Sequence, residues 1–291
     1  MEVIRWEEGP PFLAASRQGK VALFGAPLDM TTSYRSGTRL GPRRIREASQ
    51  GLEEFSLEQE GSLEEVSFSD LGDLLLPLGD VKGSLEVIQE AASRLLDEGR
   101  IPFALGGEHL ITYPLVKAAL ERYPDLFVLQ LDAHADLREE YLGVALSHAC
   151  VIRRLAEVMD PRRLVQIGIR SGTREELAFA RSWTRFFPFE ARRYLPEILS
   201  LPGLKAAPVY ITLDIDVLDP AVVPGTGTPE PGGLFLEELL DVLKAFSSLS
   251  IVAVDLVELS PPWDPTGRSE LVAAKLVREM LIAWFREGGQ G

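Results

Sequence analysis

The sequence is poor in cysteine and amide side chains and lacks long apolar runs. Cys150 is the single cysteine, which excludes an intramolecular disulfide and a cysteine-ligated zinc site. Asparagine is absent and arginine far outnumbers lysine. The loss of thermolabile amide side chains points to a heat-adapted source, whereas the arginine excess would equally follow from a GC-rich genome. No run of about 18 apolar residues is present, and Met1–Phe12 lacks the apolar stretch of a signal peptide. We therefore expect a cytoplasmic protein.

The chain is also short of positive charge. It has 44 acidic against 30 basic side chains, a net charge of −14 and a pI of about 4.8. Nucleic-acid-binding proteins present a basic face, so a nucleic-acid partner is not expected. The acidity has two interpretations that the sequence leaves open: solubility alone, or a field that attracts a cationic substrate.

The length and composition favour one large domain. The 291 residues are 46% hydrophobic, which suffices for a single core. No linker-like or low-complexity stretch divides the chain, and no internal repeat is evident. We expect a single domain over residues 1–291, with residues 1–19 as an N-terminal extension.

Short apolar runs alternate with amphipathic helical patterns along the chain. The runs are continuous, which is typical of strands buried on both faces of a parallel sheet. We predict a single α/β domain with an open, mostly parallel eight-stranded sheet and helices on both faces. A (β/α)₈ barrel is the alternative that the pattern leaves open, and in both folds ligands gather at the carboxyl ends of the strands. The predicted strands are Val21–Gly25, Val66–Ser69, Pro102–Leu105, Leu126–Leu131, Leu164–Ile169, Arg185–Phe189, Val209–Leu213 and Ile251–Val254, and the predicted helices are Arg43–Ala48, Leu85–Glu98, Ser147–Val158, Leu236–Phe246 and Glu270–Phe285.

Aspartate and histidine side chains follow three of these strands. Asp132, His134 and Asp136 come directly after Phe127–Leu131, and residues two apart in an extended chain project to the same side. The small Ala133 and Ala135 between them leave room for convergence on one point.

The same spacing occurs at a second strand end, and a histidine follows a third. Asp214 and Asp216 follow Val209–Leu213, and His109 follows Ile101–Leu105 after two glycines. Buried carboxylates repel one another unless a cation neutralises them. Carboxylate and imidazole ligands without thiolate suit Mn²⁺, with Zn²⁺, Co²⁺ or Fe²⁺ as alternatives. Six ligands are about right for two ions, and a pair about 3.5–4 Å apart can hold a bridging water as hydroxide near neutral pH.

The order and spacing of these motifs resemble a known family, the ureohydrolases, which comprise arginase, agmatinase and their relatives. The resemblance covers roughly Ala22 to Ala274 and is strong because the motifs occur together in one order. Its motifs are Ser36–Arg43, Gly106–His109, Asp132–Asp136, Ser147–Ala149, Asp214–Pro220, Pro224–Leu234 and Val257–Thr266, of which the last two are more similar to agmatinases than to arginases.

The resemblance implies two Mn²⁺ ions per subunit on an open parallel sheet. It implies that the ions are held by six side chains, some of them shared. His109 and Asp136 would bind one ion, His134 and Asp216 the other, and Asp132 and Asp214 would bridge both. The resemblance further implies that His148 carries a proton to the leaving amine and that Glu258 binds the guanidinium. It also implies homotrimers or homohexamers.

The loop after the Asp-His-Asp motif bears on the substrate. In arginases this loop recognises the amino acid with polar residues, Asn and Ser among them, but Leu137–Leu146 has neither and offers Glu139 and Glu140 instead. We predict that these two glutamates meet a cationic end of the substrate. Agmatine, giving urea and putrescine, and aminopropylagmatine, giving urea and spermidine, both fit.

Other functions remain open at this stage. Arg35, Arg39 and Arg138 would suit an acidic guanidino compound such as guanidinobutyrate, and arginase activity is a further alternative. A zinc amide hydrolase of deacetylase type has a similar fold but uses more histidines than the three in this chain. A metal-free binding protein on the same scaffold would be expected to have lost ligands, and all six are present.

Overall fold

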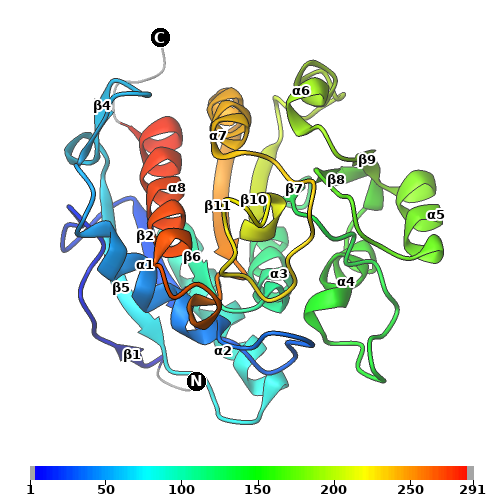
Figure 1. The fold of residues 1–291 in the computed structure, drawn as a ribbon, viewed down its shortest axis with the longest axis horizontal. Coiled ribbons are helices and arrows are strands. Elements are labelled where there is room, and N and C mark those ends of the chain that lie inside the picture. The colour runs from blue at the N-terminus through cyan, green and yellow to red at the C-terminus, as the bar shows by residue number, and fades with distance from the viewer. Residues whose placement is uncertain (1–3, 287–291) are drawn as a thin grey trace.

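The centre of the molecule is a nine-stranded sheet in a computed structural model that describes residues 4–286 (Figure 1). Its strands are β1 (Trp6–Glu7), β2 (Val21–Ala26), β5 (Phe68–Leu74), β6 (Ile101–Gly106), β7 (Phe127–Leu131), β8 (Leu164–Ile167), β9 (Arg185–Phe187), β10 (Pro208–Asp214) and β11 (Ser250–Val257), while β3 (Phe55–Ser56) and β4 (Gly61–Ser62) form a separate hairpin. The spatial order is β1-β5-β2-β6-β11-β10-β7-β8-β9. Eight strands are parallel, and β1 pairs antiparallel with β5 at one edge. The predicted open, mostly parallel sheet is confirmed, and the barrel is not formed.

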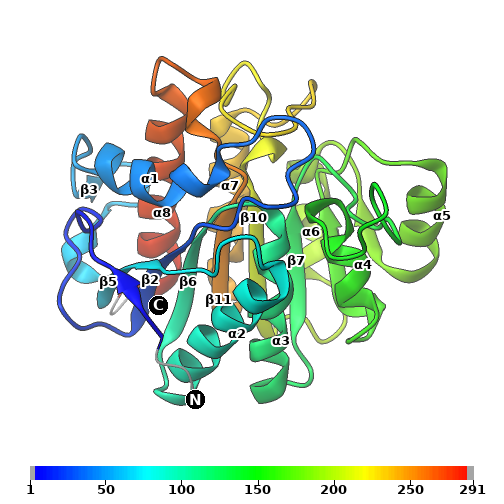
Figure 2. The same ribbon diagram turned by 90° about the horizontal axis from the view of Figure 1, so that it is seen from below.

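Helices cover both faces of the sheet. They are α1 (Gly41–Ser49), α2 (Val81–Asp97), α3 (Thr112–Arg122), α4 (Val151–Ala156), α5 (Arg174–Trp183), α6 (Ala191–Leu199), α7 (Leu236–Ala245) and α8 (Arg268–Phe285). On one face α1 contacts α8, α8 contacts α7, and α7 contacts α6, while on the other α2 contacts α3 and α3 contacts α4 (Figure 2). Among residues 4–286, no helix is both long and apolar enough to cross a membrane.

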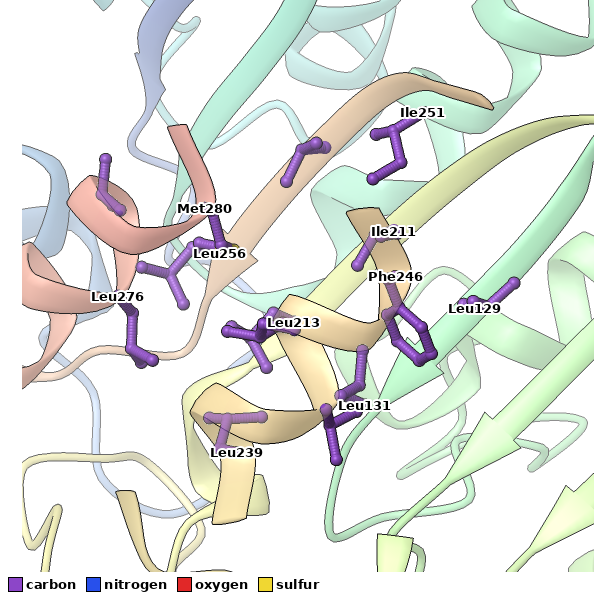
Figure 3. Packing of buried hydrophobic residues seen from close by; sticks show 14 of the residues in the cluster. Leu129, Leu131, Ile211, Leu213, Leu239, Phe246, Ile251, Leu256, Leu276 and Met280 are labelled. Atoms are coloured by element: carbon purple, nitrogen blue, oxygen red, sulfur yellow. The ribbon is translucent and has the colours of Figure 1, made fainter. Parts of the chain in front are cut away.

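The strands supply a separate hydrophobic core to each helix layer because successive side chains point to opposite faces. Leu129 packs in the core beneath α6, α7 and α8, whereas its neighbour Val128 packs in the core beneath α2, α3 and α4. Figure 3 shows Leu129, Ile211 and Leu256 of three adjacent strands facing α7 and α8. Burying one such side chain contributes about 1.5–3 kcal/mol, so these layers fix the strand ends firmly.

Strand β5 differs most from its prediction. It was predicted over Val66–Ser69 but runs to Leu74, through a stretch with two aspartates that looks unsuited to a buried strand. The guanidinium of Arg46, itself 2% exposed, lies 2.7 Å from Asp70 and also bonds Asp73. This buried pairing offsets the charge, and it joins residues too far apart in sequence to be recognised as partners.

Residues 4–19, the described part of the predicted N-terminal extension, pack against the rest of the chain. Trp6 and Glu7 add the edge strand β1, and Phe12 is 1% exposed with its ring edge-on to Phe68. The eight predicted strands and five predicted helices are all present with shifted ends, and α3, α5 and α6 were not predicted.

Candidate active site

Four neighbouring strands at the centre of the sheet deliver the predicted site residues. The order β6-β11-β10-β7 places their carboxyl ends side by side. His109 begins a 3₁₀ turn after β6, Asp214 ends β10, and Glu258 follows β11 directly. The segment Asp132–Asp136 follows β7. Residues more than a hundred positions apart therefore share one point in space, as ligands do at the strand ends of open α/β sheets.

His109 stands at the centre of a first group of carboxylates. Its Nδ1 lies 3.1 Å from an oxygen of Asp132, 3.2 Å from Asp136 and 3.3 Å from Asp214. All four side chains are buried, and this Nδ1 has no well-aligned hydrogen-bond partner. A buried nitrogen that faces three carboxylates without a directed bond is the arrangement expected of a metal ligand.

A second group adjoins the first and shares Asp132 with it. His134 Nδ1 lies 2.9 Å from Asp216 and 3.7 Å from the other oxygen of Asp132. One ligand atom from each residue of the two sets His109–Asp132–Asp214 and Asp132–His134–Asp216 falls within 4.8 Å of the others in its set. Asp132 thus belongs to both sets, whereas Asp214 belongs only to the first and accepts a bond of 2.8 Å from the backbone N–H of Asp216.

The electrostatics of both groups favour a bound cation. Burial, then the charges of Asp216 and Asp132, hold the pKa of Asp214 well above its usual value. Burial and the Asp132 charge also raise the pKa of Asp136 to about 7. Divalent cations would offset this crowding of negative charge, and the donor set of carboxylate and imidazole fits Mn²⁺ and similar ions.

A buried hydroxyl network holds the ring of His109 from behind. Its Nε2 lies 2.9 Å from the hydroxyl of Thr212, which donates a 2.6 Å bond to Asp255. Thr112 and Tyr210 also donate to Asp255, so this carboxylate accepts three hydroxyls. Outer partners of this kind orient a ligating histidine, and here they turn Nδ1 toward the carboxylates.

A partly open cavity of about 260 Å³ lies against the two groups. Its lining includes the predicted residues His109, His134, Asp136, Asp214, His148 and Glu258, and Arg138, which the sequence suggested for an acidic substrate. Ser33, Tyr141, Glu176 and Thr228 also line it and were not predicted.

Glu258 presents an unpartnered carboxylate oxygen beside the cavity. Its Oε1 accepts a bond of 2.7 Å from the backbone N–H of His109, while its buried Oε2 has no hydrogen-bond partner. Burial raises the pKa of Glu258 to about 8. Its φ of 67° is rarely adopted by a non-glycine residue, and Asp136 shares this feature with a φ of 51°. Strained backbone of this kind concentrates at functional sites.

His148 lies on the same side of the cavity as Glu258. Its Nδ1 is 3.9 Å from Glu258 Oε1, and its Nε2 is 3.1 Å from the hydroxyl of Ser33. The ring of Tyr141 meets it edge-on at 6.4 Å. Burial, followed by the neighbouring His109 and His134, lowers the pKa of His148 to about 4, so its imidazole is neutral near pH 7.

The predicted substrate glutamates lie outside the cavity lining. Glu139 is exposed and pairs with Arg153 at 3.0 Å, and Glu140 is exposed as well. This placement does not support the prediction that they meet the substrate. An acidic residue that does line the cavity is Glu176, which is 4% exposed and lies 3.6 Å from Arg138.

Glu176 also caps the helix α5. Thr173 and Glu176 have the spacing of a helix capping box, and both bonds of that box are present at the start of α5. Glu176 also accepts the backbone N–H of Leu137, next to the metal-site segment. Glu176 therefore both caps α5 and lines the cavity, and its position in the cavity becomes apparent only from the fold.

Residues 19–283 match the arginase family. The chain belongs to this family. It is 46% identical to the agmatinase of Bacillus anthracis over 272 residues, which cover 92% of this chain and 93% of that protein. It is 39% identical to the human mitochondrial guanidino acid hydrolase, over 90% of this chain and 77% of that protein. Among solved structures, a putative agmatinase from Clostridium difficile superposes with a TM-score of 0.86 at 38% identity, covering 91% of this chain and 97% of the other.

The predicted membership of the family of arginases and agmatinases is therefore confirmed, and with it the assignment of this chain as a hydrolase. The deacetylase-type and metal-free alternatives gain no support from these arginase-family matches.

Proposed function

We propose that this arginase-family hydrolase cleaves agmatine to urea and putrescine, with two Mn²⁺ ions per subunit. The observation that carries the proposal is the unpartnered Oε2 of Glu258, buried in a cavity beside two His/Asp groups. A buried carboxylate oxygen without a partner is costly, and a planar guanidinium would supply two parallel N–H donors and the opposite charge. The matching curated agmatinases support the same substrate class.

The six predicted ligands would hold the ions, with His109, Asp132, Asp136 and Asp214 around one and Asp132, His134 and Asp216 around the other. Two divalent ions bound there would activate water as the nucleophile that a guanidinium carbon requires.

The remaining steps fall to Glu258 and His148. Glu258 holds the guanidinium so that its carbon faces the two His/Asp groups. A new C–O bond forms as the water oxygen attacks, and the neutral imidazole of His148 accepts the released proton at Nδ1. The same nitrogen then gives that proton to the departing nitrogen as the C–N bond breaks, and the proton of the new hydroxyl passes to the released amine as the C=O bond of urea forms, so no net proton is taken from solvent. The products are urea and an alkylammonium ion.

Two further residues of the cavity lining bear on the other end of the substrate. Glu176 offers a buried carboxylate to an ammonium tail such as that of agmatine. Arg138 lies beside it, 38% exposed and stacked on Tyr141 at 5.0 Å, and would suit a carboxylate tail. The second candidate function is therefore hydrolysis of a guanidino acid such as guanidinobutyrate, which the similarity to the human guanidino acid hydrolase also supports.

The finer expectations from the sequence extend the proposal. Aminopropylagmatine, yielding spermidine, remains the longer alternative substrate. We further propose a single domain over residues 1–291, a homotrimer or homohexamer, a cytoplasmic location and a heat-adapted source.

The test is urea release from the Mn²⁺-loaded enzyme, with kcat/KM compared for agmatine, aminopropylagmatine, arginine and guanidinobutyrate. The highest value for agmatine supports the proposal. Preference for guanidinobutyrate or arginine would keep the guanidino chemistry and replace the substrate. Absence of urea from all four, with metal bound, would refute the function.

A further inference from the structure

We infer that Glu108 is a positioning residue that fixes the orientation of His148 through Thr31 and the nearby Ser33. This inference rests on the proposed function, because it assigns a purpose to the proton transfer that we place at His148. Glu108 precedes His109 in the chain, yet its carboxylate accepts hydrogen bonds from residues 30–32 instead of facing the two His/Asp groups.

The carboxylate of Glu108 gathers the segment at residues 30–32. It is 0% exposed, and its Oε2 accepts the backbone N–H groups of Met30 at 2.9 Å and Thr31 at 2.7 Å. Its Oε1 accepts the hydroxyl of Thr31 at 2.7 Å, and a weaker bond of 3.3 Å comes from Thr32. An ionised carboxylate can only accept hydrogen bonds, and each of these four contacts comes from an N–H or O–H donor. The segment is therefore held in one conformation.

That segment and Ser33, which follows it directly, then hold His148 at two points. The hydroxyl of Thr31, after donating to Glu108, accepts the backbone N–H of His148 at 3.0 Å. Two residues later, the hydroxyl of Ser33 meets Nε2 of the His148 ring at 3.1 Å. One contact fixes the backbone and the other fixes the ring.

The two contacts together decide which ring nitrogen faces the cavity. With Nε2 occupied by Ser33, Nδ1 is the nitrogen left toward Glu258, at 3.9 Å from Oε1. The proposed guanidinium would lie against that carboxylate, so Nδ1 is the nitrogen that can reach the departing amine. A ring rotated out of this position would lose the proton transfer while leaving Glu258 and the His/Asp groups in place.

The decisive variant is Thr31→Val, which is nearly isosteric and removes both hydroxyl contacts. Displacement of a catalytic group by about 1 Å costs on the order of 10²-fold, so we expect kcat for agmatine to fall about 10- to 100-fold. KM and bound Mn²⁺ should stay within about twofold, because no substrate or metal contact is removed. Thr31→Ser restores the hydroxyl and should recover most of the activity.

A control threonine lies seven residues further along the chain. Thr38 is 0% exposed, whereas Thr31 is partly buried, and the Thr38 hydroxyl makes only a long contact of 3.5 Å with the carbonyl of Leu28. Thr38→Val should leave kcat within about twofold of wild type. Melting temperatures of both variants report whether either change simply loosens the fold.

A double-mutant cycle separates positioning from a general structural effect. If Thr31 acts through His148, Thr31→Val should cost less than about twofold in a His148→Ala background, since coupled changes are not additive. An agmatine analogue with oxygen next to the guanidine nitrogen leaves as a less basic amine and needs less proton transfer. The loss caused by Thr31→Val should shrink with this substrate.

Three results would overturn the inference while leaving the proposed function intact: equal losses in Thr31→Val and Thr38→Val, full additivity with His148→Ala, or an unchanged loss with the oxygen analogue. Absence of urea production by the wild-type enzyme would instead refute the proposed function.

Discussion

Replacement of Glu258 by glutamine tests the observation on which the proposed function depends. The side chains have the same shape, and the amide oxygen can keep the 2.7 Å bond from the backbone N–H of His109. The amide NH₂ then stands where the unpartnered Oε2 was, and it meets the guanidinium donor to donor.

The magnitude follows from the burial of the carboxylate, which is 2% exposed. Removing one partner of a buried charge pair costs about 2–5 kcal/mol. At about 1.36 kcal/mol per factor of ten, kcat/KM for agmatine should fall roughly 30- to 5,000-fold. Binding of the guanidinium precedes the reaction, so part of the loss should appear as a raised KM.

The assay is steady-state urea release, with bound Mn²⁺ measured in the same samples. Glu279→Gln serves as the matched control, because Glu279 is 1% exposed but bonds Arg278 and Ser56 away from the cavity. Its kcat/KM should stay within about twofold of wild type. A Glu258→Gln enzyme that retains Mn²⁺ and loses less than threefold in kcat/KM would refute the assigned role.

Further predictions concern the metal site, pH and substrate choice. Thr212→Val should weaken Mn²⁺ binding about 10- to 100-fold, by competition with a chelating indicator, whereas Tyr210→Phe, which spares the contact with His109, should have a smaller effect. Because burial raises the pKa of Glu258 to about 8, the metal-free fold should lose stability as pH rises from about 4.5 to about 8, by up to about 1.4 kcal/mol per pH unit from this group. Denaturant unfolding in chelator should show a shallower decline for Glu258→Gln, and an equal decline would contradict the assignment. Arg138→Gln should shift the kcat/KM ratio toward agmatine over guanidinobutyrate by up to about fivefold, since part-exposed pairs contribute up to about 1 kcal/mol; an unchanged ratio would remove Arg138 from substrate recognition.

The sequence predicted the sheet and the clustering of His and Asp residues because both depend on local patterns. A continuous apolar run such as Phe127–Leu131 identifies a buried parallel strand, and the alternation Asp132-Ala-His134-Ala-Asp136 begins where that run stops. Parallel strands end at one edge of the sheet, so no further information was needed to bring these residues together.

The parts that could not be predicted depend on contacts between distant segments. Ser33 lies 115 positions from His148, and no local pattern connects them. Glu139 and Glu140 were chosen because they are acidic and near the motif, yet the loop turns them outward to solvent and to Arg153. Local composition cannot tell which side of a loop faces a cavity, since tertiary packing decides it.

Groups proposed to bind metal or substrate also destabilise the fold when neither is bound. Glu258 Oε2 and His109 Nδ1 are buried without hydrogen-bond partners, and Glu258 and Asp136 adopt strained backbone conformations. Each would be costly in an ordinary core. They are held because the strands beneath them pack on two helix layers, and because Glu108 and Asp255 fix the neighbouring segments with complete sets of hydrogen bonds. Glu108 and Asp255, whose carboxylates are fully hydrogen-bonded, thus keep groups with unsatisfied hydrogen-bonding capacity, such as Glu258, in position for a cation. This explains why buried acidic groups with and without partners lie within one site.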